Sequence, residues 1–77
     1  MAYNQEDSLK FNVVEEIAVL SENGNWAKRL NIVQWNDNIA KYDIRSWSSD
    51  YSKMGKGVTL TYQELIALKK ALNEMDI

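Results

Sequence analysis

The segment KYDIRSW, residues 41–47, decides the fold more than any other stretch of the sequence. Side chains alternate between the two faces of a β-strand, so a strand here brings Lys41, Arg45 and Trp47 to one face. A row of cations that ends in an indole suits a phosphate backbone and an unpaired base, and it suits almost no covalent chemistry. The segment therefore predicts one strand of a surface for single-stranded nucleic acid.

Upstream of this segment, the sequence predicts a long β-hairpin. Residues 9–20 are rich in β-branched and aromatic side chains, which favour a strand, and residues 26–36 form the returning strand. Asn23-Gly24 lies between them and favours a type I′ turn, because both central residues of that turn need a positive φ. A loop at residues 37–39, with Asn38 in the left-handed conformation, leads to a third strand at residues 40–47.

Downstream of it, the sequence predicts a flexible loop over residues 48–57, a short fourth strand over residues 58–60 and then a helix. Thr61 and Glu64 have the spacing of a capping box, in which each side chain accepts a hydrogen bond from the backbone amide of the other residue. The helix is expected over residues 62–75. Its apolar side chains repeat at helical spacing: Leu65, Leu68, Leu72 and Met75, with Ile66 beside them.

The expected fold class is α+β: a four-stranded antiparallel meander (β-β-β-β-α) with one C-terminal amphipathic helix. The turns also predict the register of the strands. Glu16 and Ile17 should pair with Asn31 and Leu30, and Asn31 should pair with Arg45 across the second hairpin. One face then forms a core for the helix to cover: Val13, Ile17, Leu30, Ile32, Tyr42 and Ile44. The opposite face collects polar and aromatic residues: Arg29, Asn31, Trp35, Lys41, Arg45 and Trp47.

Composition narrows the possible functions. The 77 residues include no Cys and no His, which removes disulfides, thiolate nucleophiles, zinc fingers and Ser-His-Asp triads. The adjacent acids Glu15 and Glu16 point to opposite faces of a strand, so we expect no enzyme, no metal site, no cofactor and no small-molecule substrate. No apolar run approaches the ~20 residues of a membrane span, and no secretory signal is recognisable, which favours the cytoplasm.

The small size of the chain predicts one domain over residues 9–77, after a disordered, acidic tail over residues 1–8. A chain this short buries only about 60–65% of its unfolded surface, so a second copy of the chain is the expected stabilising partner. The net charge of −2 is unusual for a nucleic-acid binder, but it is unevenly spread. Residues 26–61 hold six cations and three acids, a local balance of +3.

Two motifs make the sequence resemble the positive cofactor four family of transcriptional coactivators, including its short bacterial and phage members. They are DIRSW, residues 43–47, and KGVTL, residues 56–60, followed by the polar start of a helix. The resemblance covers residues 29–75. It implies a dimer with packed helices, and single-stranded DNA bound across curved sheets with little sequence preference. The third strand departs from the family pattern, because only Trp47 stands where two adjacent aromatic residues are common.

The resemblance implies that Arg45 contacts phosphate, that Trp35 and Trp47 offer stacking surfaces and that Lys56 adds a further cation. The residues expected to bind nucleic acid are Arg29, Trp35, Lys41, Arg45, Trp47, Lys53 and Lys56. Further candidates are Trp26, Lys28 and Asn31. The dimer interface is expected at Leu65, Leu68, Leu72 and Met75, although this stripe also fits a helix that covers its own sheet.

We therefore expect a cytoplasmic, nucleoid-associated homodimer that binds single-stranded DNA and acts in transcription, replication or repair. Two alternatives remain at this point: a protein-interaction adaptor that uses the aromatic face, favoured by the acidic pI of about 5.0, and a protein that prefers RNA. Charge reversal at Arg45 is expected to cripple oligonucleotide binding with little effect on stability, which would separate the first alternative from DNA binding.

Overall fold

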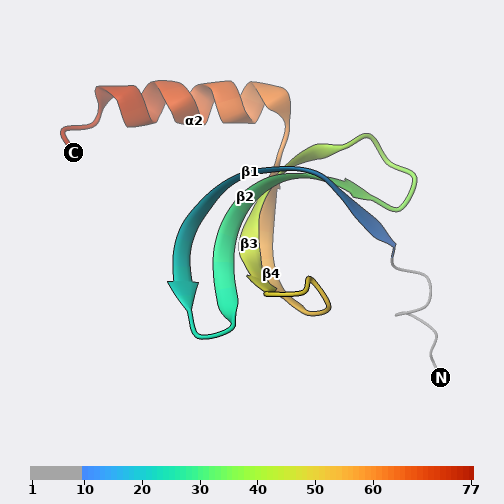
Figure 1. Cartoon of the computed structure of the whole chain (residues 1–77). Helices are drawn as coiled ribbons and strands as arrows, with labels where there is room; N and C mark the ends of the chain where they lie inside the picture. Colours follow the sequence, from blue (N-terminus) through green and yellow to red (C-terminus); the bar gives the residue numbers. More distant parts are fainter. Residues whose placement is uncertain (1–9) are drawn as a thin grey trace.

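A computed structural model describes residues 10–77 and shows one curved antiparallel sheet followed by a helix (Figure 1). The sheet has the strand order β1-β2-β3-β4. The elements are β1 (Phe11–Asn23), β2 (Trp26–Trp35), β3 (Lys41–Ser48), β4 (Met54–Leu60) and α2 (Tyr62–Glu74). The predicted meander with one C-terminal helix is confirmed. The tail expected at residues 1–8 lies outside the described residues.

The turn between β1 and β2 differs by one residue from the prediction. Asn23 pairs with Trp26, so Gly24 and Asn25 are the two central residues of the turn. Gly24 has a φ of 63°, whereas Asn25 is not among the residues with positive φ. Glycine at the first central position, with positive φ there alone, is the pattern of a type II′ turn rather than type I′.

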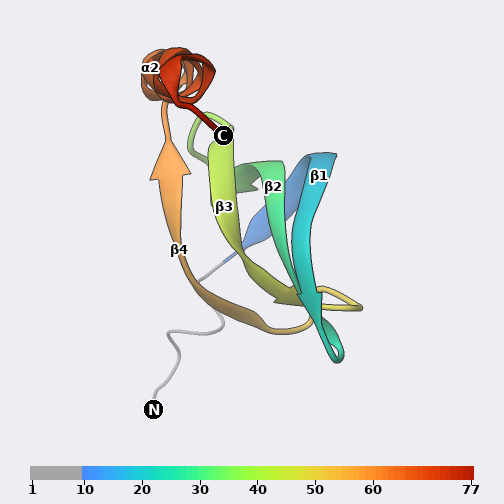
Figure 2. The same cartoon turned by 90° about the vertical axis from the view of Figure 1, so that its left-hand side faces the viewer.

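β1 is longer than the strand that it pairs with, and it bends as a result. Its 13 residues face the 10 residues of β2. The surplus is taken up at three register shifts, which leave Val14, Ile17 and Leu20 unpaired. Bulges of this kind bend a strand and increase its twist, and the sheet is strongly curved in both views (Figures 1 and 2). The uniform register predicted for this hairpin is therefore wrong, except near Glu16, which does pair with Asn31.

The register of the second hairpin is offset by two residues from the prediction. Arg29 pairs with Arg45, and Asn31 pairs with Asp43 instead of Arg45. The left-handed residue is Asn36, with a φ of 54°, and not Asn38. Two hydrogen bonds join Asn36 to Lys10, which directly precedes β1. The Asn36 amide donates to the Lys10 carbonyl (2.6 Å), and the Asn36 side-chain oxygen accepts from the Lys10 amide (2.8 Å). An offset of two preserves which side chains share a face, because the side-chain period of a strand is two.

The sheet has two faces, which differ in the side chains that they carry. The inner face carries Phe11, Glu16, Ala27, Arg29, Asn31, Val33, Trp35, Lys41, Asp43, Arg45 and Trp47, and the outer face carries Leu30, Ile32, Tyr42, Ile44, Val58 and Leu60. Every buried residue of the described chain is on the inner face: Ala27, Asn31, Val33, Asp43 and Trp47. The polar and aromatic face is thus the core, and the prediction that the outer face forms the core is wrong.

The helix begins at a capping box and does not cover the sheet. The Thr61 amide donates to the Glu64 carboxylate (2.8 Å), and the Glu64 amide donates to the Thr61 hydroxyl (3.1 Å). None of its residues is buried, and its axis runs away from the strands (Figures 1 and 2). The expected packing of α2 on the outer face is therefore absent from residues 10–77. This helix is too short and too polar to cross a membrane.

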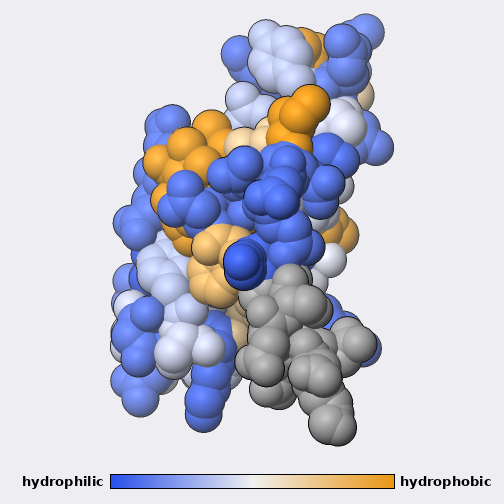
Figure 3. Space-filling view, turned by 90° about the vertical axis from the view of Figure 1, so that its right-hand side faces the viewer, coloured by the Kyte–Doolittle hydropathy of each residue, from blue (hydrophilic) through white to orange (hydrophobic). Residues whose placement is uncertain are grey.

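The apolar side chains that the helix and the outer face present remain accessible. Val58, Ile66, Leu72 and Met75 are each about half exposed. Apolar groups (orange) are visible on the surface below the helix, between hydrophilic ones (Figure 3). This part of the molecule lacks the cover that the inner face has.

Candidate nucleic-acid interface

Four aromatic rings form a cluster on the inner face. The rings of Trp35 and Trp47 are nearly parallel, with centroids 6.2 Å apart and an interplanar angle of 12°. Phe11 tilts against both, and Tyr51 from the β3–β4 loop packs on Trp47 at 5.0 Å. Each such pair contributes about 0.5–1.5 kcal/mol beyond its burial. Trp47 is fully buried by this packing, whereas Trp35 remains partly accessible.

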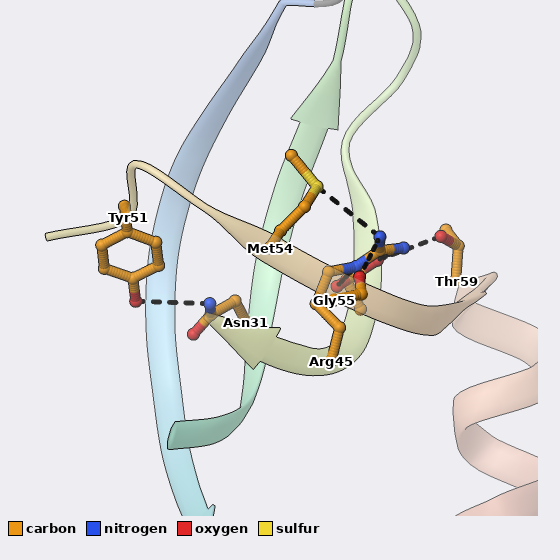
Figure 4. Close-up of polar contacts among 7 residues, drawn as sticks. Asn31, Arg45, Tyr51, Met54, Gly55 and Thr59 are labelled. Atoms are coloured by element: carbon orange, nitrogen blue, oxygen red, sulfur yellow. Dashed lines mark hydrogen bonds and ion pairs between the residues drawn. The ribbon is translucent and has the colours of Figure 1, made fainter. Parts of the chain in front are cut away.

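Arg45 and Asp43, both on β3, form a buried ion pair, and Figure 4 shows Arg45 among its polar partners. The Arg45 guanidinium donates two hydrogen bonds to the Asp43 carboxylate, at 2.7 and 2.9 Å, and a third to the Gly55 carbonyl at 3.3 Å. The Thr59 hydroxyl donates to the same carboxylate at 3.1 Å. The Arg45 guanidinium also lies over the Trp35 ring, 4.7 Å from its centroid. Asp43 has no exposed surface, so a carboxylate without this partner would be an unpaired buried charge.

Gly57 is explained by the close approach of β4 to β3. It lies directly opposite Arg45 in the β3–β4 ladder. A Cβ atom on Gly57 would collide with the Cβ atom of Arg45 and with the Ile44 carbonyl oxygen. The glycine of the Lys-Gly-aliphatic motif thus lets β4 pass close to the Asp-Ile-Arg motif of β3.

The β3–β4 loop is shorter and more ordered than predicted, because β4 begins at Met54. The Asp50 carboxylate accepts hydrogen bonds from the Ser52 hydroxyl (2.6 Å), the Ser52 amide (2.9 Å) and the Ser48 hydroxyl (2.9 Å). These bonds, those from Ser52 first, lower the pKa of Asp50 to about 2. Tyr51 has a φ of 63°, an uncommon conformation for a bulky residue. The loop thereby turns the Tyr51 ring onto Trp47.

A second polar group surrounds the Tyr51 ring. The Arg29 guanidinium lies 5.3 Å from the ring centroid, and the Asn31 amide donates to the Tyr51 hydroxyl at 3.4 Å (Figure 4). Burial raises the pKa of Tyr51 above its usual value, and the Glu16 carboxylate adds to this rise while Asn31 and Arg29 oppose it. Two buried atoms lack a hydrogen-bond partner here: Nε of Arg29 and Oδ1 of Asn31.

The remaining predicted binding residues divide between the two faces. Lys41 lies at the inner face beside Val33, and its side chain is exposed. Trp26 and Lys28 are on the opposite side of β2, because they pair with Ser48 and Ser46 next to the outer-face ladder. Two further cations are exposed: Lys53 in the β3–β4 loop and Lys56 in β4. The structure thus brings Arg29, Asn31, Trp35, Lys41, Arg45 and Trp47 to one face, as predicted.

Three residues of the site were not predicted from the sequence: Phe11, Glu16 and Tyr51. Phe11 shares the face of Trp35, but the bulges of β1 hide that relation from simple alternation. Glu16 is predicted to lie opposite Asn31, but the sequence assigns it no role in binding. Tyr51 lies in a loop where no periodic pattern applies, and the one signal for it is an aromatic residue within an otherwise polar segment.

The fold and the site together define a small α+β module whose curved sheet presents cations and aromatic rings on one face, an arrangement typical of nucleic-acid-binding proteins. The family model described as Transcriptional Coactivator p15 (PC4) matches residues 22–71, and the chain belongs to this family. Membership indicates a nucleic-acid-binding protein with a role related to transcription, and the family is not one of enzymes.

A bacterial relative extends the similarity beyond the matched segment. The chain is 47% identical over 72 residues to an uncharacterized protein of Treponema pallidum (strain Nichols). The match covers 92% of this chain and 85% of the relative. The two proteins therefore share nearly their whole length, including the β1–β2 hairpin.

Proposed function

We propose that this protein binds single-stranded DNA, largely independently of sequence, and acts where a duplex opens in transcription, replication or repair. The observation that carries the proposal is the inner face, where guanidinium groups lie over aromatic rings at the surface of a curved sheet. Such a surface pairs phosphate neutralisation with base stacking, the two interactions that sequence-independent single-strand binders combine. Association with the bacterial nucleoid in the cytoplasm is the setting that we propose.

The cations that remain free support phosphate binding. Lys41, Lys53 and Lys56 are exposed. Arg45 contributes differently from the prediction, because Asp43 already neutralises its charge. We therefore assign Arg45 the task of holding the Trp35 ring in place, and we expect its charge reversal to unfold the protein. That variant no longer separates DNA binding from an adaptor function.

The aromatic residues support base stacking in an unequal way. Trp35 is partly accessible whereas Trp47 is fully buried, so Trp35 is the proposed platform for a base. Stacking on such a ring is worth roughly 1–3 kcal/mol per base. Trp47 lies beneath Tyr51 and Phe11, so a base reaches it only if the Tyr51 loop moves away.

We also propose that the active form is a homodimer. The half-exposed apolar side chains of α2 and of the outer face support it, since a monomer leaves them in water. The predicted interface residues lie on this helix: Leu65, Leu68, Leu72 and Met75. The other face of the sheet then stays free for DNA.

Tryptophan fluorescence tests the binding proposal. We expect saturable quenching on titration with a 20-nucleotide oligothymidine, weakening with salt, and much weaker binding of a duplex of equal length. Trp35→Ala should lower the affinity for the single strand, whereas Trp26→Ala on the opposite side of β2 is the matched control. If no strand quenches at low salt, the proposal fails, and an RNA strand of the same sequence tests the RNA alternative.

A further inference from the structure

A pocket opens on the inner face where β1 bulges between Glu16 and Ala18. Its volume is about 190 Å³, and it is lined by Glu16, Ile17, Ala18, Val19, Arg29 and Asn31. The bulge leaves Ile17 unpaired and sets Glu16 across from Asn31. Bulges often re-aim side chains beside functional sites. The pocket is therefore a product of the irregular register that the sequence did not predict.

Two residues that line this pocket, Arg29 and Asn31, each have a buried polar atom without a hydrogen-bond partner, although buried polar groups nearly always have one. Asn31 has no exposed surface, yet its Oδ1 atom accepts no hydrogen bond. In this structure its amide nitrogen is directed to the Tyr51 hydroxyl at 3.4 Å, which leaves the oxygen as the free end of the group. Nε of Arg29 is likewise buried and unpaired. Two residues that line one pocket thus carry a buried acceptor and a buried donor that have no partner within the described residues.

Glu16 is unexpected on a surface that faces a polyanion. A carboxylate repels phosphates, and it only accepts hydrogen bonds. It becomes favourable beside a nucleic acid when it meets donor groups of a base. With Asn31 Oδ1 and Arg29 Nε, the pocket offers two acceptors and one donor.

The four DNA bases differ in the pattern of their Watson–Crick edges. Guanine presents two donors, N1–H and the N2 amino group, and one acceptor, O6. Thymine presents a single N3–H donor between two acceptors, cytosine presents one donor group beside two acceptors, and adenine presents one donor group and one acceptor. Proteins that bind single strands read these edges directly when the base is splayed out of the stack. Only guanine complements two acceptors and one donor.

We propose that the pocket formed by Glu16, Arg29 and Asn31 is a base-reading subsite that accepts a guanine of the bound strand. This inference rests on the proposed function, since the strand must first lie on the inner face. The subsite adds a local preference to binding that is otherwise independent of sequence. The Tyr51 hydroxyl orients the Asn31 amide and so acts as a positioning group.

The experiment compares three 20-nucleotide strands by fluorescence anisotropy: oligothymidine, the same strand with isolated guanines at every fifth position, and that strand with inosine in place of guanine. Isolated guanines avoid four-stranded structures. We expect the guanine strand to bind about 5- to 150-fold more tightly than oligothymidine, the range for one well-formed bidentate base contact. Inosine lacks the N2 amino group and should lose most of the gain.

Two variants assign the preference to the pocket. Glu16→Gln should shrink the ratio of guanine-strand to oligothymidine affinity, because an amide replaces an acceptor-only group. Glu15→Gln is the matched control, since Glu15 pairs with Ile32 and belongs to the outer side of the sheet. It should leave the ratio unchanged.

The outcomes separate the two proposals. Tight binding of oligothymidine with no gain from guanine, or an equal gain from inosine, overturns the subsite and leaves the proposed function standing. Failure of all three strands to bind overturns both. A guanine gain that Glu16→Gln leaves intact overturns the assignment to this pocket.

Discussion

The inner and outer faces of this sheet are built from the same strands but are completed in different ways. On the inner face, Asp43, Arg45 and Thr59 satisfy one another, and four aromatic rings bury Trp47. On the outer face and on α2, apolar side chains such as Val58 and Leu72 remain half exposed. One face is complete within a single chain, and the other lacks cover. Polar and aromatic residues thus form the buried core of this small fold, while many of its aliphatic residues remain partly exposed.

Removing the buried carboxylate should have the largest effect. Asp43→Ala leaves the Arg45 guanidinium unpaired in the interior, and breaking a buried ion pair costs about 3–5 kcal/mol. The free energy of unfolding, measured by urea denaturation, should fall by that amount. Asp37→Ala, at an exposed loop position, is the control and should change it by less than about 0.5 kcal/mol. Equal stability of both variants would break the claim that the inner face is the core.

The outer region should respond to a charge on the helix. Leu72→Glu places a carboxylate in the apolar stripe and should raise the dimer dissociation constant at least tenfold, because burying a leucine is worth roughly 1.5–3 kcal/mol. Analytical ultracentrifugation over a concentration series measures it. Ala71→Glu adds the same charge to the neighbouring exposed position and should leave the dimer intact. A wild-type chain that stays monomeric at high concentration would contradict the proposal of a dimer.

A methyl group tests how closely β4 approaches Arg45. Gly57→Ala forces the Arg45 side chain or the Ile44 carbonyl to shift, and such overpacking costs typically about 1–3 kcal/mol. Gly55→Ala is matched to it, since a Cβ there meets the nearest atoms of Ser46 at an ordinary 3.8 Å. Thermal unfolding should separate the two variants clearly. Equal unfolding temperatures for the two variants would show that the close approach of Gly57 to Arg45 does not affect stability.

The order of the elements and the residues that share a face could be predicted from the sequence, whereas the position of the core could not. The order of elements followed from turns and periodicity, and the capping box at Thr61 was read directly from spacing. The face shared by Arg29, Lys41 and Arg45 was predicted because an offset of two residues preserves side-chain direction. These features depend on local pattern, which a sequence displays.

The core and the bulges could not be predicted in the same way. Leu30 and Ile44 have the composition of a core, but the helix that should cover them runs away from the sheet. Asn31 and Asp43 are polar yet fully buried, because their partners come from other segments. The bulges at Val14, Ile17 and Leu20 arise from the unequal lengths of β1 and β2. The pocket beside Glu16 lies at the bulge of Ile17, so it could not be predicted from the sequence either.

The cations proposed to bind phosphate should affect binding and not folding. Four phosphate contacts, at Arg29, Lys41, Lys53 and Lys56, predict a slope of about −2.8 for log K against log salt, at roughly 0.7 per phosphate for a single strand. Lys41→Ala should reduce the slope by about 0.7 with stability unchanged. Lys70→Ala, on the helix, should alter neither quantity. A salt-independent affinity would contradict phosphate binding altogether.

The smallest effect is expected in the β3–β4 loop. Hydrogen bonds from Ser52 and Ser48 hold the pKa of Asp50 at about 2, below the ~3.9 of an unfolded chain. A lowered pKa stabilises the folded loop above pH ~4, and this contribution is lost as the pH falls through 2. Asp50→Asn should abolish that dependence. The difference in tryptophan fluorescence between the two proteins, followed from pH 5 to pH 2, measures it, and parallel curves would argue against the hydrogen-bonded loop.

Binding of single-stranded DNA to the inner face is tested most directly by an NMR titration of the ¹⁵N-labelled protein with a 20-nucleotide oligothymidine. We expect the amide shifts to concentrate at Arg29, Trp35, Lys41 and Tyr51, while those of Leu30, Ile44 and the α2 helix remain nearly constant. Shifts centred on the outer face or on α2, with the inner face silent, would contradict it.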